Sequence, residues 1–450
     1  MTEPLWSSAA LPSTSGPDKP NLIACVRRAF FRSCTRLANL LTVERVALHA
    51  ALLAAFLWSG YAVDLATPGL HDRAGNIKGA DFLHFYTAGR LLRTGHANAL
   101  YDPGAQAGYQ TALLPESRGT YFVPMYGPQV YWLFEPLAGL PYGWAVMIWA
   151  LGNCGLYCGC CYLFWRSCFH LKPHGHLIFL LALAYPGFFS LIAFGQTSGL
   201  ALVVFTIAFF ALRAGRSFLA GVAFGSLIYK PQLGVAAAVV LIATAQWRVL
   251  AGGATAIIAQ LGFARVWFGG ALLRRYGQMF LRVARVQPFL EPKLYQMHSL
   301  RSFLMLLLPS NGFALVLYVL SAIAVLVVAV LCWRRADDLR LRYAALLTGS
   351  VLVAPHLWIY DLVIFAPALL LLADWAFSHQ HAETTGSIWV IIYSCYALPL
   401  LGPVAEVTRV QISVIAFAIL LWLLYTASKQ SGNDVPEPAP KSVNLEMYSE

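Results

Sequence analysis

The sequence predicts an all-α polytopic membrane protein, and three observations support this fold class. Hydrophobic residues make up 59% of the 450 residues and charged residues only 11%, against roughly 45–50% and 25% in soluble globular domains. The mean hydropathy is +0.64. Several apolar runs approach the ~20 residues that a helix needs to cross a bilayer. Soluble enzymes, nucleic-acid-binding modules and secreted disulfide scaffolds are therefore excluded together.

Twelve apolar runs are the candidate transmembrane helices. They lie at 46–66, 142–165, 176–194, 198–213, 217–230, 232–246, 249–269, 311–333, 342–355, 358–376, 387–402 and 410–428. Proline breaks the hydrogen-bond ladder of a helix. Because Lys230-Pro231 interrupts 217–246, this stretch is either one kinked helix or two.

The two ends of the chain are polar, and both are predicted to be cytoplasmic. Residues 1–45 form a basic, partly disordered segment, and residues 429–450 have too little apolar surface to fold. With this orientation most short cationic loops lie inside, as the positive-inside rule requires. These loops carry Arg166, Lys172, Arg213, Arg216, Arg248, Arg334, Arg335, Arg340 and Arg342.

Two long segments then fall on the exoplasmic side. Residues 67–141 are too polar to span, but Phe82, Phe85 and Tyr86 share one side of a helical pattern, which suggests helices lying at the membrane surface. The loop 270–301 is basic, with one acid, Glu291, and therefore violates the charge rule. Either this basic charge has a function on the exoplasmic side, or the predicted topology is different. Its cations are Arg274, Arg275, Arg282, Arg285, Lys293 and Arg301.

Unusual polar residues cluster on the same side. Lys230 lies between apolar runs, where a charge costs ~2.5–3.5 kcal/mol on insertion scales. It either snorkels to the interface or binds an anionic group, and in the second case Lys230→Met should leave the fold intact. Asp81, with His84 three residues later, is either a helix N-cap or a general base. Gln196 lies in GQTSG, which also works as a plain turn.

The nine cysteines do not suggest a disulfide framework, because none lies in a long exoplasmic segment. Cys154, Cys158 and Cys161 share a helical face, but no histidine or carboxylate joins them. We interpret them as small apolar residues of a membrane helix. Neither a metal nor a cofactor is predicted.

Three runs in this order resemble the recurrent blocks of glycosyltransferase family 87. They are DFLHFYTAGRLLRTGHANALYDP, GQTSGLALVVFTIAFFALRAGRSFLAGVAFGSLIYKPQLG and APHLWIYDLVIFAPALLLL. The resemblance covers most of residues 46–428. It implies a bundle of the GT-C type with about twelve transmembrane helices and a long exoplasmic loop, 67–141. It also implies lipid-phosphate sugar donors, an exoplasmic active site and an essential aspartate in the first large loop.

Residue by residue, the resemblance assigns the catalytic aspartate to Asp81. It assigns the KPQ block to Lys230 and Gln232, and a histidine block to His356. A lipid-phosphate donor would explain the basic exoplasmic loop, so Arg274, Arg275, Arg282 and Arg285 join Lys230 and Gln232 as expected phosphate ligands. The expected substrate-positioning residues are His84, Arg90, Gln196, His356 and Asp361. The stretch YFVPMYGPQVYWLFEPL is only loosely similar to the proline-rich segment usual in the family. This departure affects the expectation for acceptor recognition more than the expectation for the chemistry.

The function implied by the resemblance is inverting, metal-independent transfer of a hexose, mannose by analogy. The donor is a polyprenyl-phosphate sugar, and the acceptor is a lipid or glycan hydroxyl. The location is a bacterial-type plasma (inner) membrane, with membrane lipids and no nucleic acid as partners. A transporter or flippase of lipid-linked sugars is the alternative, although the few transmembrane acids (Asp64, Asp361, Asp374) lie near helix ends. A catalytically inactive assembly partner is a third possibility.

Overall fold

The computed structural model describes residues 22–282, 291, 293–379 and 384–430. In these residues the regular structure is α- and 3-10-helical, and two isolated β-bridges join described residues, His71 to Ile77 and Met297 to Trp358. The chain is a polytopic membrane protein. Among the residues that the structure describes, seven helices are long and apolar enough to cross a membrane, or up to eight if the pair Lys172–Leu183 and Pro186–Phe194, bent by 45°, is one span. The total of twelve spans stays a prediction.

The α-helices are α1 (Leu22–Ala38), α2 (Val43–Ala66), α3 (Phe82–Arg93), α4 (Pro103–Leu113), α5 (Pro128–Trp132), α6 (Tyr142–Ser167), α7 (Gly175–Leu183), α8 (Pro186–Phe194), α9 (Ser198–Arg213), α10 (Ser217–Ser226), α11 (Pro231–Ala243), α12 (Trp247–Trp267), α13 (Gly269–Leu281), α15 (Leu300–Leu307), α16 (Asn311–Arg335), α17 (Leu339–Val353), α18 (Ala366–Ser378), α19 (Thr385–Ala397), α20 (Gly402–Thr408) and α21 (Ile412–Gln430). The 3-10 helices are η1 (Ala97–Ala99), η2 (Pro115–Ser117), η3 (Leu137–Gly139), η4 (Lys172–His174), η5 (Leu227–Tyr229), η6 (Leu294–Gln296), η7 (Ile359–Phe365) and η8 (Leu398–Leu401).

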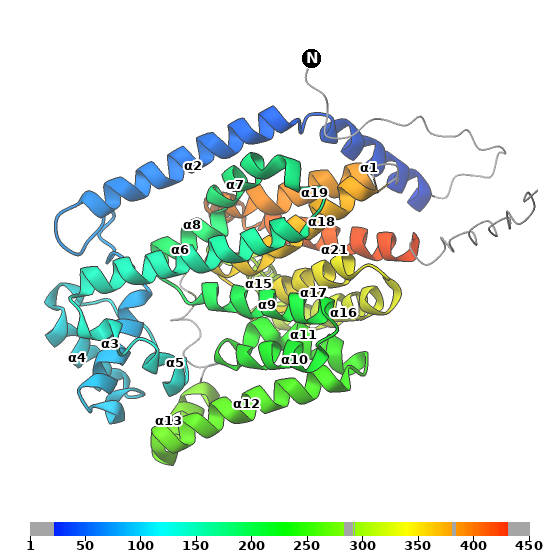
Figure 1. Cartoon of the computed structure of the whole chain (residues 1–450). Coiled ribbons are helices and arrows are strands. Elements are labelled where there is room, and N and C mark those ends of the chain that lie inside the picture. Colours follow the sequence, from blue (N-terminus) through cyan, green and yellow to red (C-terminus); the bar gives the residue numbers. More distant parts are fainter. Residues whose placement is uncertain (1–21, 283–290, 292, 380–383, 431–450) are drawn as a thin grey trace, which may run out of the picture.

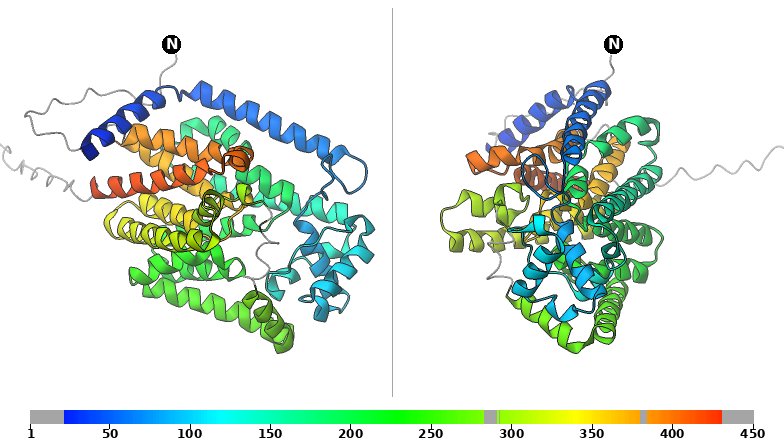
Figure 2. Two further views of the ribbon diagram at one scale, coloured as in Figure 1. Left: turned by 180° about the vertical axis from the view of Figure 1, so that it is seen from behind. Right: turned by 90° about the vertical axis from the view of Figure 1, so that its left-hand side faces the viewer.

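The long helices run side by side and define two ends of the bundle (Figures 1 and 2). We call the end that carries α3, α4 and α5 the loop end. The opposite end, where α1 and the end of α21 lie, is the terminal end. Each predicted span coincides with a helix or a pair of helices. The span 176–194 is a pair broken at Pro186, where α8 begins, and the spans 217–230 and 232–246 are separated at Pro231, where α11 begins. The stretch 217–246 is thus two elements separated at Lys230.

Helix α3 is deeply buried. Nine of its twelve residues are buried, on every side of the helix. Phe85 stacks on Phe134 at a centroid distance of 4.6 Å, and Phe82 lies against Trp149 of α6. The aromatic side of α3 is therefore covered by protein and forms the core of the long segment, while the place of α3 at the membrane surface stays a prediction.

Helices α10 and α12 touch through their backbones because glycine faces glycine at their crossing. A Cβ atom at Gly221 would overlap the carbonyl oxygen of Val249, and one at Gly225 would overlap that of Gly253. Small residues four apart permit this close approach in membrane helices. The contact holds α10, whose continuation η5 ends directly before Lys230.

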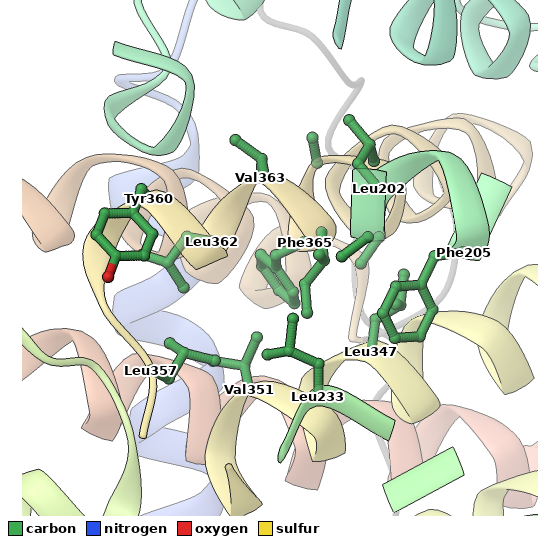
Figure 3. Close-up of a cluster of buried hydrophobic side chains, with 14 of the residues drawn as sticks. Leu202, Phe205, Leu233, Leu347, Val351, Leu357, Tyr360, Leu362, Val363 and Phe365 are labelled. Carbon is green, nitrogen blue, oxygen red and sulfur yellow. The ribbon is translucent and has the colours of Figure 1, made fainter. Parts of the chain in front are cut away.

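An apolar layer lies at the centre of the bundle (Figure 3). It joins α9, α11, α17 and η7 through side chains that are almost completely buried. The labelled members are Leu202, Phe205, Leu233, Leu347, Val351, Leu357, Tyr360, Leu362, Val363 and Phe365. Since α9, α11 and η7 each begin beside the polar residues of the candidate site, this packing fixes their relative positions.

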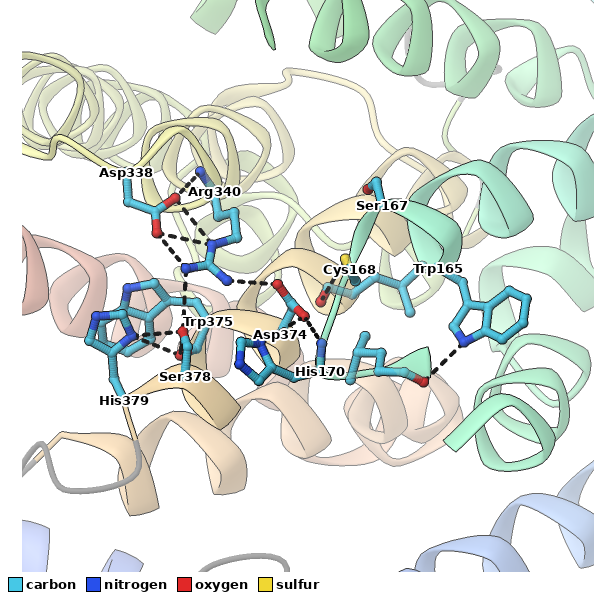
Figure 4. A network of polar contacts seen from close by, with 12 residues as sticks. Trp165, Ser167, Cys168, His170, Asp338, Arg340, Asp374, Trp375, Ser378 and His379 are labelled. Carbon is cyan, nitrogen blue, oxygen red and sulfur yellow. Dashed lines mark hydrogen bonds and ion pairs between the residues drawn. The ribbon is translucent and has the colours of Figure 1, made fainter. Parts of the chain in front are cut away.

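At the terminal end, a set of ion pairs joins α17 to α18 (Figure 4). Arg340 donates from Nη2 to Asp338 Oδ2 at 2.7 Å and from Nη1 to Asp374 Oδ2 at 2.6 Å. The backbone N–H of His170 donates to Asp374 Oδ1 at 2.8 Å. We call Asp338, Arg340, Asp374 and His170 the terminal-end network.

Candidate active site

The turn after α8 brings Asp81 against the C-terminal end of that helix. Helix α8 ends at Gly195 in the left-handed conformation, with φ of +66°. The N–H of Asp81 donates to the carbonyl of Phe194 at 3.0 Å. A Cβ at Gly195 would collide with Cβ of Phe82, so only glycine permits this contact between the start of α3 and the end of α8. Asp81 and Gln196, 115 residues apart, therefore become neighbours.

The carboxylate of Asp81 is held by a neutral donor. Asp81 precedes α3, but its side chain does not cap the helix. Instead Oδ2 accepts a hydrogen bond from Nε2 of Gln196 at 2.7 Å. Burial raises the pKa of Asp81 to about 6, while the Gln196 hydrogen bond and the charge of Lys230 oppose that rise. Such a carboxylate is mostly ionised at neutral pH and is still basic enough to accept a proton.

Gln196 connects the carboxylate to a buried lysine. Its Oε1 accepts from the Tyr126 hydroxyl at 3.4 Å and from Lys230 Nζ at 3.5 Å. This arrangement fixes the amide orientation, because only the nitrogen can donate to a carboxylate and only the oxygen can accept from an ammonium. Asn153 holds the backbone by donating to the Gln196 carbonyl at 3.0 Å. GQTSG is therefore more than a plain turn.

Lys230 is 2% exposed and does not snorkel to the interface. Its Nζ contacts Oδ1 of Asp361 at 2.8 Å and Oγ of Ser198 at 2.9 Å, besides Gln196. Three acceptors match the three N–H donors of an ammonium. The Tyr360 ring lies 5.3 Å from Nζ, within range of a cation–π interaction. We call Asp81, Gln196, Ser198, Lys230 and Asp361 the site network.

His84 lies directly behind Asp81 and is uncharged. Burial is the main cause that lowers its pKa to about 3. Its Nδ1 lies 2.8 Å from the carbonyl oxygen of Asp81. Since that oxygen can only accept, Nδ1 carries the proton and Nε2 is left as an acceptor. Nε2 is buried without a hydrogen-bond partner in the described structure.

Aromatic residues surround the site network, and the sequence did not single them out. Tyr126 stacks on His84 at 5.6 Å and on Tyr229 at 6.4 Å between ring centroids. The chain 358–360 adds Trp358 and Tyr360, whose rings are nearly parallel at 6.1 Å. Tyr360 could have been predicted from its position beside Asp361. Nothing in the sequence distinguishes Tyr126 from the other tyrosines of the long segment.

A second polar cluster lies at the other end of this aromatic row. Both oxygens of Glu291 lie 2.7 Å from Nη1 of Arg301. Glu291 Oε1 also lies 3.0 Å from Nδ1 of His356. Although burial raises the pKa of Glu291, the hydrogen bonds from His356 and Arg301 outweigh that effect and lower it. His356 contacts Trp358 edge to face at 6.4 Å, so the row Trp358–Tyr360 separates the two clusters.

The other predicted residues lie at varying distances from the site network. Gln232 is half-buried in the first turn of α11, two residues after Lys230. Arg90 lies further along α3 and donates to the carbonyl of Ala138 at 2.9 Å, away from Asp81. Arg274 and Arg282 are exposed on α13 and at its C-cap. Arg285 lies outside the described residues.

Helix α13 is attached to the long segment near the site. Arg275 donates to the carbonyl of Asn98 at 2.5 Å. The ring of Tyr276 lies 5.6 Å from that of Tyr101, whose hydroxyl donates to the carbonyl of Tyr126 at 2.8 Å. The basic loop is thus linked by two tyrosines to the residue that touches Gln196.

The described residues contain no group of three or more histidine, cysteine, aspartate and glutamate side chains that could hold a metal ion. Cys154, Cys158 and Cys161 are free thiols on α6. The site network itself supplies two carboxylates, an amide, a serine hydroxyl and an ammonium.

Comparison with known proteins connects this site to one enzyme family. No curated protein and no solved structure matches the chain. The sequence model of glycosyltransferase family 87 matches residues 124–355, more than half of the chain but a narrower range than the resemblance over 46–428. The match includes Tyr126, Gln196, Ser198 and Lys230, whereas Asp81 and Asp361 lie outside it. The chain belongs to glycosyltransferase family 87 and is a membrane glycosyltransferase.

Proposed function

We propose that this enzyme transfers a hexose, mannose by analogy, from a polyprenyl-phosphate donor to a lipid or glycan hydroxyl, with inversion and without a metal ion. The observation that supports the proposal best is the state of Asp81. Its carboxylate is partly accessible, bound by a neutral amide rather than a cation, and has a pKa raised to about 6. A general base works best when its pKa lies near the operating pH.

In the proposed reaction, the acceptor oxygen attacks the anomeric carbon as its proton passes to Asp81. The bond from that carbon to the phosphate oxygen breaks at the same time, and the phosphate leaves with the electron pair. One carboxylate is enough for a single displacement, because phosphate is a good leaving group without protonation. Each transfer therefore inverts the anomeric configuration.

Lys230 serves in this proposal as a positioning residue. Its three donors are already directed to Asp361, Ser198 and Gln196. It holds Gln196, which in turn orients Asp81. The earlier assignment of the donor phosphate to Lys230 stays a prediction, and Arg274, Arg275 and Arg282 at the loop end are the cations left for that role. Arginine suits it because its fork can bind phosphate oxygens in pairs.

His84 suits a sugar hydroxyl better than a phosphate. Its Nε2 has a lone pair and no proton, so it accepts a hydrogen bond and would repel an anionic oxygen. The loop end, with its basic α13, is the proposed exoplasmic side of a bacterial-type plasma membrane. The transporter alternative loses support, because the chain belongs to an enzyme family.

The test is an assay of the purified enzyme in detergent with a panel of polyprenyl-phosphate hexoses and a lipid extract as acceptor. We expect turnover with one hexose donor, full activity in the presence of EDTA, and a product of inverted anomeric configuration by NMR. A nucleotide-sugar requirement, retention of configuration or inactivation by EDTA would each overturn the corresponding part of the proposal. The Asp81→Asn enzyme serves as the blank.

A further inference from the structure

A cavity of about 130 Å³ lies in the half of the bundle away from the site network. It separates α7 on one side from α18 and α19 on the other. Tyr157 of α6 forms part of its floor, and Val46 of α2 closes it near the terminal end. It shares none of its lining residues with the site network, so the proposed chemistry does not account for it.

The lining of this cavity is almost entirely apolar. Its tyrosines turn their hydroxyls away to other partners: Tyr157 donates to the carbonyl of Ala182 at 3.0 Å, and Tyr396 to that of Leu181 at 3.1 Å. Tyr393 pairs with Nδ1 of His49 at 2.7 Å. Apolar cavities of roughly 150 Å³ stay dry and accept hydrocarbon groups. A sugar or a phosphate would find almost no hydrogen-bond partner here, whereas a hydrocarbon chain needs none.

The rim at the terminal end is cationic. His174 lines the cavity there, stacked on Phe377 at 5.3 Å. Arg45 directly precedes the lining residue Val46, and Lys172 lies two residues before His174. Both are exposed, as are Arg32 and Arg36 of α1. In the described stretches 29–49 and 168–176 the only carboxylate is that of Glu44.

We propose that this cavity binds a segment of one acyl chain of an anionic phospholipid whose headgroup lies against Arg45 and Lys172. An apolar cavity among membrane helices with cations at its rim matches the two halves of such a lipid. The lipid would fill the space between α7 and α19 and support α2, which has only three buried residues, Val46, Ala50 and Ala54. This site is independent of the proposed reaction.

The test uses the full chain in nanodiscs of phosphatidylcholine that contain a phosphatidylglycerol with a diazirine in one acyl chain. After irradiation, peptides of α7 and α18 should carry the label, and an equal amount of diazirine-phosphatidylcholine should label them less. Lys172→Gln should lower the preference for phosphatidylglycerol by about fivefold, the effect of one cation at a membrane surface.

Two substitutions fill the cavity from opposite walls, Ala373→Phe on α18 and Ala182→Phe on α7. Either folded variant should lose most of the labelling on the facing wall. Ala254→Phe, at an exposed position of α12, is the matched control and should change nothing. The proposal is overturned by an unlabelled α7 and α18 in the unmodified protein, a measurement that needs no variant. It is also overturned if Ala373→Phe and Ala182→Phe leave the labelling unchanged. Equal labelling by the two phospholipid probes, or labelling only by a polyprenyl-phosphate probe, would overturn it as well.

Discussion

The site network and the terminal-end network each contain two carboxylates, yet they hold them differently. In the terminal-end network one guanidinium binds both Asp338 and Asp374 (Figure 4). In the site network the cation goes to Asp361, and Asp81 is held by neutral donors, the amide of Gln196 and the hydroxyl of Tyr360. A carboxylate that is paired with arginine is held by strong charge-assisted hydrogen bonds, so it is a poor proton acceptor. In the proposed reaction the base is therefore the carboxylate whose partners are neutral, and four predictions test this distinction.

The largest effect is expected for Asp81→Asn. The substitution keeps the shape of the side chain but removes the base, so turnover should fall by ~10²–10⁴-fold, as is typical of general-base catalysis. The raised pKa means that the folded state holds its proton more tightly than the unfolded state. Stability therefore decreases as pH rises from about 4 to about 6, and the neutral asparagine should be at least as stable as wild type at pH 7.

Asp102→Asn is the matched control for that substitution. Asp102 caps α4 by accepting from the N–H of Ala105 at 3.0 Å, and asparagine caps a helix equally well. Its turnover should stay near wild type. More than about a tenth of wild-type turnover in Asp81→Asn, or a comparable loss in Asp102→Asn, would falsify the assignment of the base.

The next effect concerns the buried pair Lys230–Asp361. The sequence predicted that Lys230→Met would leave the fold intact, and the structure changes that expectation, because Asp361 would keep a buried charge with only neutral donors and no cation. Breaking one half of such a pair costs ~3–5 kcal/mol. Denaturation in detergent should show this loss for Lys230→Met and most of it recovered in the double variant with Asp361→Asn. If the double variant is as unstable as the single one, the two charges are not coupled.

A smaller effect is expected on the pH dependence of the reaction. The ionised form of Asp81 is the base, so kcat/KM should fall as pH decreases through about 6. The hydrogen bond from Gln196 lowers the pKa of Asp81, so its loss in Gln196→Leu should move this inflection to higher pH. Gln260→Leu on α12, where the amide bonds within its own helix, is the control. An unmoved inflection in Gln196→Leu shows that the titrating group is not Asp81.

The smallest effect on catalysis is expected at the terminal end. Arg340→Leu removes the donor shared by Asp338 and Asp374, so the melting temperature should fall. The value of kcat at a temperature where the protein stays folded should not change. A drop in kcat with unchanged stability would mean that the two networks are coupled, and the contrast between them would fail.

The sequence predicted the positions of the helices well because lipid leaves few alternatives for the backbone. It also marked Gln196 and Lys230, since polar residues stand out between apolar runs. It could not predict that Lys230 pairs with Asp361, 131 residues away, because hydropathy does not encode which helices meet. For the same reason the pattern of Phe82, Phe85 and Tyr86 could not distinguish a lipid surface from a protein core.

The length of α10 has a consequence for the membrane itself. The helical run Ser217–Tyr229 rises only ~20 Å, against ~30 Å for the hydrocarbon core. Its glycine contact with α12 prevents it from sliding. If this run is one of the proposed spans, the turn at Lys230 lies below the water boundary, and the surrounding bilayer must thin to let a sugar reach it. Longer acyl chains in the host membrane would then slow the enzyme without touching any residue, so bilayer thickness becomes a control on glycosylation.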